Sequence, residues 1–229
     1  MQEHTVKAFD EDITKLRGLI AEMGGLAEYA ISRAMDALVR NDLALAAEVI
    51  ADDTKLDALE HEVDKLAVRI IALRAPMADD LREVIADLKI AGIVERIGDY
   101  AKNIAKRSRN IEDIRRFEPL ALLPSMADLA IAMVRDVLTA HAARDAKAAE
   151  AIIARDEKVD AFYNSLFRNL TSYMMENPAT ISASAHLLFV ARNLERIGDH
   201  ATNIAEQVYF ASTGDYLPDR NDPERSNAD

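Results

Sequence analysis

A twelve-residue motif occurs twice in this chain, at a separation of one hundred positions. VERIGDYAKNIA begins at Val94 and LERIGDHATNIA begins at Leu194, and nine of the twelve residues are identical. The similarity extends beyond the motif, because DTKLDA at residue 53 matches DEKVDA at residue 156, and Pro76 matches Pro178. A repeat of this length indicates that the chain consists of two similarly folded units in tandem.

Each unit shows the pattern of long amphipathic helices. In the first unit, apolar residues recur three or four positions apart, as expected of a helix with one buried face: Leu56, Leu59, Val63, Leu66 and Ile70. Pro76 ends this pattern, because the residue before a proline is disfavoured in the helical conformation, and Pro178 does the same in the second unit. We therefore expect six helices, at residues 10–40, 43–74, 79–114, 120–144, 146–176 and 180–212.

The composition favours an all-α fold. Only 7 glycines and 6 prolines occur in 229 residues, and half of the residues are hydrophobic. Because three amphipathic helices joined by short turns pack most simply as an antiparallel bundle, we predict two tandem antiparallel three-helix bundles, an internal repeat with six long helices. The expected domains are 1–116 and 117–213, followed by a polar tail at 214–229 that we expect to be disordered.

Charge and composition exclude several classes of protein. A net charge of −12 would repel nucleic acid and anionic lipid, so we expect neither as a direct partner. The absence of cysteine excludes disulfides and thiolate metal sites. The first residues lack the basic head and apolar run of a signal peptide, and no apolar stretch is long enough to span a membrane. These features predict a soluble, cytoplasmic protein.

Within the repeated motif, three polar residues recur at four-residue intervals and would form one row along a helix. The row consists of Glu95, Asp99 and Asn103 in the first copy and of Glu195, Asp199 and Asn203 in the second. The apolar residues around Ile97 lie on the opposite side of the same helix, so we expect the row to face away from the core. Core packing accounts for Ile97, but it does not account for the acids.

A second pair of acids lies on the expected middle helix of each unit, at Asp53 and Asp57 and at Asp156 and Asp160. In an antiparallel bundle, the middle and third helices can set the two acidic rows side by side. Carboxylates four residues apart repel each other by roughly 0.2–0.5 kcal/mol on an isolated helix. Hard cations such as Mg²⁺, Ca²⁺ or Mn²⁺, and also iron, would reverse that repulsion. Without cysteine or a nearby histidine, a closed structural zinc site is disfavoured.

Simpler interpretations stay open at this point. Acids four residues apart are common on solvated helix faces, so the rows are also consistent with a helical scaffold that binds nothing. Gly98 and Gly198 interrupt otherwise good helices, which indicates a close approach between helices. A carboxylate-bridged di-iron oxidase is a third interpretation, but such sites use Glu-x-x-His pairs that project into the bundle, and this chain has none.

Three stretches together resemble the PhoU family of bacterial phosphate-transport accessory proteins: the paired ERIGD-x-A-x-NIA motif, RIIALRAPMADDLR and TSYMMENPATI. The resemblance implies a cytoplasmic, non-enzymatic adaptor built from two three-helix bundles, and a homodimer. Its implied partners are the ATPase subunit of a high-affinity phosphate ABC transporter and a phosphate-sensing membrane histidine kinase. Through them, family members reach the membrane only peripherally, restrain phosphate uptake and act as negative regulators of phosphate-starvation signalling.

The resemblance also implies metal ligands, because E/DxxxD motifs of several PhoU-like proteins hold metal clusters on the bundle surface. Carried over residue by residue, the ligands are Asp53, Asp57, Glu95, Asp99, Asp156, Asp160, Glu195 and Asp199, with Asn103 and Asn203 as further candidates at the tail of the motif. The ion, divalent or trivalent, stays open among iron, zinc, manganese, magnesium and calcium. The alternatives are a metal-binding helical scaffold and a PhoU-like paralogue that serves another signalling route.

Overall fold

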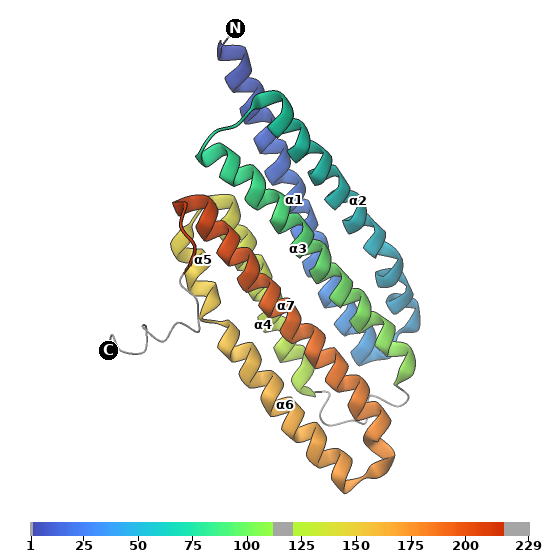
Figure 1. The fold of residues 1–229 in the computed structure, drawn as a ribbon. Coiled ribbons are helices and arrows are strands. Elements are labelled where there is room, and N and C mark those ends of the chain that lie inside the picture. Colours follow the sequence, from blue (N-terminus) through green and yellow to red (C-terminus); the bar gives the residue numbers. More distant parts are fainter. Residues whose placement is uncertain (1, 112–120, 218–229) are drawn as a thin grey trace, which may run out of the picture.

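The fold is described from a computed structural model, which covers residues 2–111 and 121–217 (Figure 1). Every regular element in those two ranges is helical. The first repeat contains α1 (Gln2–Arg40), α2 (Leu43–Arg74), α3 (Asp79–Arg107) and the short 3₁₀ helix η1 (Ser108–Asn110). The second contains α4 (Leu123–Ala143), α5 (Ala146–Ile153), α6 (Asp156–Glu176), the 3₁₀ helix η4 (Pro178–Thr180) and α7 (Ile181–Thr213). The predicted all-α fold of two antiparallel three-helix bundles is confirmed.

The same capping device starts the second helix of each repeat. The carboxylate of Asp42 accepts a hydrogen bond from the backbone N–H of Leu45 at 3.0 Å. Asp145 holds the equivalent place and accepts from Lys147 and Ala148, each at 3.0 Å. A side-chain acceptor of this kind satisfies backbone donors that the first helical turn leaves unpaired. The repeat therefore extends to the local signals that begin its helices.

Three predicted helices differ from the observed ones. The helix expected at 10–40 begins eight residues earlier, at Gln2, as α1. The helix expected at 146–176 is broken at Ala154 and Arg155, so that α5 and α6 replace it. At the break, the N–H of Arg155 donates to the carbonyl of Ile152 at 2.9 Å, and its guanidinium forms an ion pair with Asp136 on α4. The helix expected to end at 114 ends at Arg107, and residues 112–114 lie outside the described part. Of the predicted disordered tail, residues 218–229 also lie outside it.

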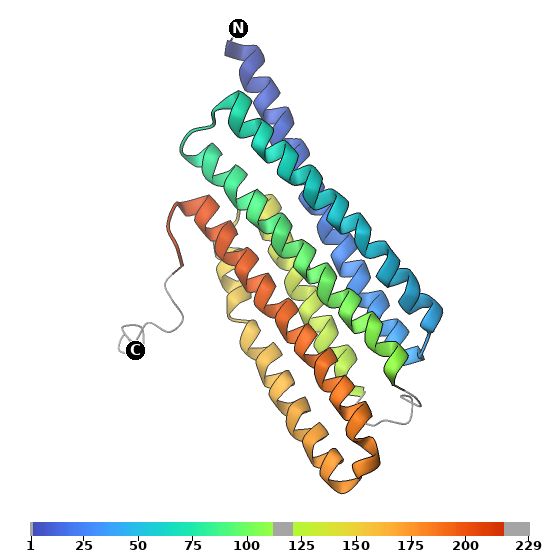
Figure 2. The same ribbon diagram turned by 45° about the vertical axis from the view of Figure 1, so that its right-hand side comes forward.

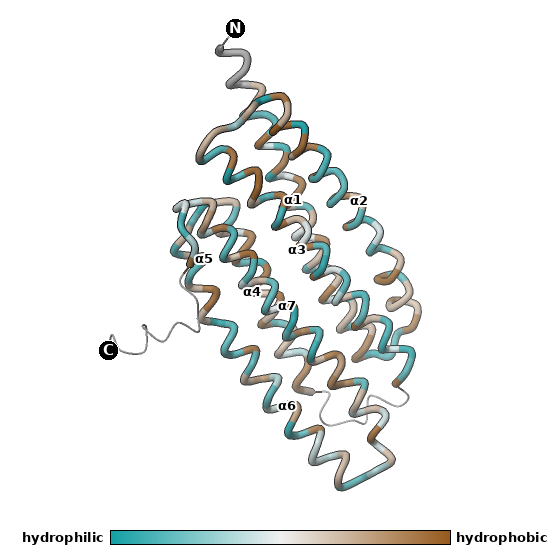
Figure 3. Tube along the Cα trace, in the orientation of Figure 1, coloured by the Kyte–Doolittle hydropathy of each residue, from teal (hydrophilic) through white to brown (hydrophobic). Residues whose placement is uncertain are grey.

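The helices are arranged in a front layer and a back layer (Figure 2). Figure 2 shows α3 and α7 side by side in front of α1 and α4, with α2 beyond α3 and α6 beyond α7. The two repeats contact each other mainly through α3 and α7, and also through α1 and α4. In Figure 3, hydrophilic and hydrophobic stretches alternate along the helices, as expected of amphipathic helices with one face on a core.

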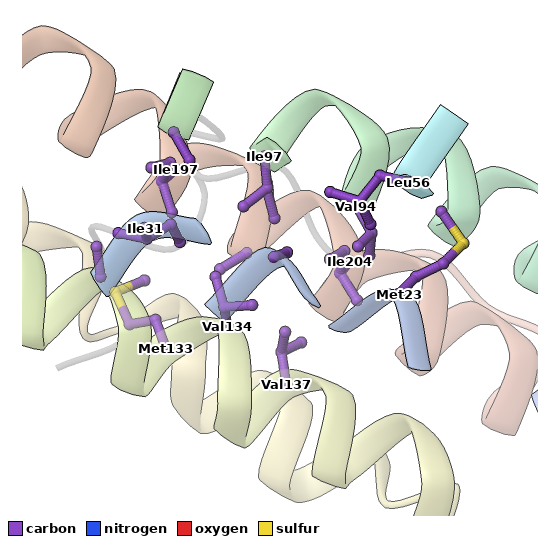
Figure 4. Close-up of a cluster of buried hydrophobic side chains, with 14 of the residues drawn as sticks. Met23, Ile31, Leu56, Val94, Ile97, Met133, Val134, Val137, Ile197 and Ile204 are labelled. Carbon is purple, nitrogen blue, oxygen red and sulfur yellow. The ribbon is translucent and has the colours of Figure 1, made fainter. Parts of the chain in front are cut away.

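The buried apolar side chains form one continuous cluster that crosses from the first repeat to the second. In Figure 4, Ile97 and Ile197, the equivalent isoleucines of the two motifs, lie near Ile31 of α1 and Val134 of α4. All four side chains are fully buried. The prediction that the motif isoleucines face the core is therefore confirmed, and the two repeats share that core.

A polar contact joins the repeats inside this core. The carboxylate of Asp87 on α3 is fully buried, and its Oδ1 lies 2.6 Å from Nε2 of His141 on α4. One turn earlier, the carboxylate of Glu83 accepts a hydrogen bond from Arg17 of α1 at 2.7 Å and forms an ion pair with Arg144, just after α4, at 3.1 Å.

Among the residues that the structure describes, no helix combines the length and apolar character that crossing a membrane requires.

Candidate functional site

The eight predicted ligands form two groups, one in each repeat. Cluster I consists of Asp53 and Asp57 on α2 with Glu95 and Asp99 on α3; cluster II consists of Asp156 and Asp160 on α6 with Glu195 and Asp199 on α7. Within each cluster the charges interact across the two helices. Asp57 of α2 raises the pKa of Glu95 on α3, and Asp156 and Asp160 of α6 raise the pKa of Asp199 on α7. The structure thus sets the acidic rows side by side.

The predicted outward orientation is wrong for one acid of the motif, Glu195, and two acids of the middle helices are also buried. Asp53, Asp156 and Glu195 are only 7%, 2% and 8% exposed, whereas Asn103 and Asn203 lie in the open. The two motif glycines explain the burial, because they allow the paired helices to approach closely. A Cβ atom at Gly98 would lie 2.3 Å from Cδ1 of Leu56. Gly98 and Gly198 therefore serve the close approach that the sequence indicated, and the acids lie along the junctions of α2 with α3 and of α6 with α7, which we call the two grooves.

In cluster I, a lysine of the chain itself neutralises part of the charge. Nζ of Lys102, on α3, forms an ion pair with Oδ2 of the buried Asp53 and lies 3.5 Å from Oδ1 of Asp99. The hydrogen bond to Asp53 raises the pKa of Lys102, so the ammonium form is favoured. Burial is the main cause that raises the pKa of Glu95, and the charge of Asp99 adds to it.

In cluster II, the compensating positive charge comes from an arginine just before the motif. Arg192, one turn before Glu195, forms an ion pair with Oε1 of that carboxylate. Oε2 of Glu195 is buried and has no hydrogen-bond partner. Burial raises the pKa of Glu195 although Arg192 opposes the shift, and burial together with Asp156 raises the pKa of Asp199. Cluster II thus holds one buried carboxylate oxygen, Oε2 of Glu195, that lacks a hydrogen-bond donor.

Three residues near the clusters were not identified from the sequence: Glu60, Lys102 and Arg192. Glu60 adds a fifth carboxylate to cluster I, because its charge raises the pKa of Glu95 and its Oε1 lies 3.4 Å from the position of a Cβ at Gly92. A usable signal existed, since Glu60 lies three residues after Asp57 and Lys102 three residues after Asp99, both on one helix face. Arg192 lies three residues before Glu195 on α7.

The carboxylate oxygens of clusters I and II are ligands of the type that a hard cation prefers. Cluster I contains five carboxylates and cluster II contains four, and the buried Oε2 of Glu195 lacks a hydrogen-bond donor. Within residues 2–111 and 121–217, however, no three His, Asp or Glu side chains are arranged closely enough to enclose a metal ion. A cation would have to draw carboxylates together across a groove from two helices.

Comparisons with known proteins agree with the repeat. The PhoU domain matches the chain twice, at residues 20–108 and 123–208. A phosphate-specific transport system accessory protein PhoU homolog from Zymomonas mobilis is 55% identical over 217 residues, covering 95% of this chain and 92% of its own. A homolog of the same name from Caulobacter vibrioides is 46% identical over 218 residues, covering 95% of each chain.

Two solved structures are similar to the whole fold. The crystal structure of PhoU from Pseudomonas aeruginosa superposes with a TM-score of 0.83 at 36% identity, covering 90% of this chain and 100% of its own. The phosphate transport system regulatory protein PhoU from Streptococcus pneumoniae gives a TM-score of 0.85 at 27% identity, covering 92% and 99%. Sequence and fold therefore point to the same relatives over nearly the full length of the chain.

Proposed function

The chain belongs to the PhoU family, and from that premise we propose that it is a regulatory adaptor of phosphate homeostasis. It is an accessory protein of phosphate transport and not an enzyme, as membership of this family of accessory proteins implies. The finer proposal is negative regulation. When phosphate is plentiful, the protein restrains phosphate-starvation signalling and high-affinity phosphate uptake, by acting between a phosphate ABC transporter and a phosphate-sensing histidine kinase.

One observation carries the proposal: the match to the Zymomonas mobilis accessory protein covers almost all of both chains. Both repeats are included, so clusters I and II and the shared core lie inside the matched region. The proposed partners are the ATPase subunit of the transporter and the cytoplasmic part of the kinase. A cytoplasmic homodimer that reaches the membrane only through these partners completes the picture.

The adaptor role sets a thermodynamic requirement. The protein can transmit the state of the transporter only if it binds two transporter states with different affinity. A shift of tenfold in that affinity corresponds to about 1.4 kcal/mol, so modest differences in docking suffice. No chemistry on a substrate is needed, in agreement with the accessory role.

We include metal binding in the proposal. Asp53, Asp57, Glu95 and Asp99 would hold a cation in the first groove, with Asp156, Asp160, Glu195 and Asp199 in the second. A bound ion would supply positive charge between α2 and α3 and between α6 and α7, and so fix the spacing of these helices. What supports this is the burial of three cluster carboxylates, Asp53, Asp156 and Glu195, and above all the buried Oε2 of Glu195, which has no hydrogen-bond partner.

Complementation tests the regulatory role directly. A bacterium that lacks its own PhoU and expresses this chain should regain repression of alkaline phosphatase at high phosphate. Continued derepression, with the protein folded and present at normal levels, would contradict the proposal. A matched variant, Lys65→Met on the exposed face of α2, should complement as well as the parent does. Pull-down with the transporter ATPase and with the kinase then separates the two proposed contacts.

A further inference from the structure

The seam between α3 and α7 lies at the centre of the front layer, between the two acidic grooves (Figure 2). The two helices run antiparallel there, so equivalent residues of the two motifs meet from opposite directions. The rings of Tyr100 and His200, which occupy the same motif position, pack edge to face with centroids 5.1 Å apart. This pair marks the middle of the seam.

Two arginines flank the aromatic pair, one from each motif. Cζ of Arg196 lies 5.8 Å from the centre of the Tyr100 ring. Arg96 holds the equivalent motif position on α3, four residues before Tyr100. The two guanidinium groups supply permanent positive charge at the centre of the seam.

The same combination recurs farther along the seam. The guanidinium of Arg107 lies over the ring of Phe189, at 4.3 Å from its centre. Phe189 and Arg196 are seven residues apart on α7, which is close to two helical turns, so both project from one face. Phe189 is 53% exposed, so its ring offers apolar surface beside the guanidinium of Arg107. A basic and aromatic strip thus runs along the junction of the repeats.

The strip stands out because the chain carries a net charge of −12. Arg96 is 66% exposed, and its only ion pair in the described part of the chain, with Glu95, spans 4.0 Å. Within that same part, neither Arg107 nor Arg196 forms an ion pair. Nη1 of Arg107 lies 3.4 Å from Nδ1 of His186, so part of that guanidinium group is engaged. The remaining N–H donors of these guanidinium groups can match a carboxylate in pairs.

We propose that this seam, consisting of Arg96, Tyr100, Arg107, Phe189, Arg196 and His200, is a docking surface for an acidic segment of a partner protein. Charge complementarity selects carboxylates, and the exposed ring of Phe189 selects a peptide over a free anion, which has no apolar part to bury. Arginine and aromatic residues are also the types that carry binding energy at protein interfaces. Clusters I and II, on either side, repel acidic residues and confine the segment to the seam.

The inference goes beyond the regulatory role, because it names a surface and the chemistry of what binds there. A direct assay needs neither transporter nor kinase. The probe is a fluorescent peptide of about 14 residues, long enough as a helix to span about 21 Å, with Glu and Leu at alternating turns. Anisotropy titrations with the full-length chain are run in EDTA, with a Lys-for-Glu peptide as the reversed-charge probe.

The expected result is that the acidic peptide binds and that the double variant R96E/R196E weakens binding at least about tenfold. The control K65E/R69E makes the same change in net charge on the exposed face of α2, and it should change affinity less than about twofold. Phe189→Ala should weaken binding as well, which a purely electrostatic attraction would not explain. Melting curves verify that each variant is folded.

Five outcomes would overturn the proposal. Equal weakening by the control would reduce the effect to net charge, and equal binding of the Lys peptide would remove the charge selectivity. Displacement by inorganic phosphate would make the seam a small-anion site. Binding of anionic lipid vesicles without peptide binding would make it a membrane contact. Loss of self-association in R96E/R196E without peptide binding would make it an interface between copies. Because each assay omits the transport system, failure here leaves the regulatory role untouched.

Discussion

Clusters I and II come from equivalent positions of the two repeats, yet the chain balances their charge from opposite ends of the motif. In cluster I the cation is Lys102, whereas the equivalent position in cluster II is Thr202, whose hydroxyl donates to the backbone carbonyl of Asp199 at 2.7 Å. In cluster II the cation is Arg192, whereas the equivalent position in cluster I is Gly92. The acids were retained, and the compensating charge moved.

The difference teaches that equal ligand sets do not make equal sites. Lys102 neutralises the innermost acid of its groove, Asp53, so cluster I is partly satisfied without an added ion. Arg192 is more exposed, engages one oxygen of Glu195 and leaves the other buried without a donor. Cluster II therefore has more to gain from a cation, and cluster I has more to lose from the removal of its lysine.

The largest expected effect is on the stability of the metal-free protein. Lys102→Met leaves the carboxylate of Asp53, only 5% exposed as a side chain, without its cation. We expect a loss of about 3 kcal/mol in the free energy of unfolding, the lower end for a broken buried pair because Lys102 is itself partly exposed. Arg192→Met should cost about 1 kcal/mol or less, since the side chain of Arg192 is 47% exposed.

Urea unfolding in EDTA measures both losses, with Lys65→Met as the exposed control, expected to stay within about 0.5 kcal/mol of the parent. Equal losses for the two cluster variants would show that the clusters are equivalent after all.

The next largest expected effect is on cation affinity. Exchanging the residue types at positions 102 and 202 should raise the affinity of one cluster and lower that of the other. Lys102→Thr should strengthen binding of Mn²⁺ or Mg²⁺ at cluster I, and Thr202→Lys should weaken it at cluster II. One unit charge about 6 Å from a divalent ion contributes about 1.4 kcal/mol even at the dielectric constant of water, so each change should be about tenfold. Isothermal titration calorimetry measures both.

Because Thr202 is buried, the melting temperature of Thr202→Lys is compared with that of the parent before titration. Affinities that do not respond to either exchange would show that the lysine position does not tune the clusters.

Alanine substitutions of the two motif glycines should separate an effect on stability from an effect on cation affinity. At Gly98 an added Cβ meets the side chain of Leu56, so Gly98→Ala should lower stability by about 1 kcal/mol, because overpacking outweighs the gain in helix propensity. At Gly198 it meets Oδ1 of Asp156 at 3.1 Å, so Gly198→Ala should lower cation affinity at cluster II more than it lowers stability. Unfolding midpoints with and without Mn²⁺ distinguish the two, and a purely structural effect at both would refute the distinction.

Local patterns predicted the parts of this molecule that depend on neighbours in sequence. The spacing of Leu56 and Val63 predicted a buried helix face, and Asp42 and its counterpart mark where helices begin. The break before Asp156 was missed because it accompanies an ion pair between Arg155 and Asp136, on different helices.

The orientation of the acids was wrong for a similar reason. A row along one helix can be placed relative to that helix's own core face, but the depth of a groove depends on how closely a second helix approaches. Gly98 allowed this approach to be predicted, yet the periodicity of a single helix could not place Asp53 inside the groove. Lys102 was missed because its main partner, Asp53, lies on another helix, whereas Arg192 and Glu195 lie three residues apart on α7 and offered a local signal.

The smallest expected difference between the clusters is in proton linkage. The pKa of Glu95 is raised in cluster I, and the pKa values of both Glu195 and Asp199 are raised in cluster II, with burial the first cause in each case. Between the ordinary and the raised pKa, the folded chain holds more protons than the unfolded chain. The free energy of unfolding must therefore fall as pH rises through that window, so the metal-free protein should gain stability as pH is lowered from the raised towards the ordinary pKa values.

Glu95→Gln removes one raised group, and the pair E195Q/D199N removes two, so the second variant should flatten the dependence of melting temperature on pH more than the first. A saturating divalent cation should reverse the slope, because it binds the carboxylates in their charged form and competes with protons. Thermal melts across this range in EDTA and in Mn²⁺ measure both effects. Equal flattening by the two variants would contradict the prediction that cluster II contributes more to the pH dependence than cluster I does.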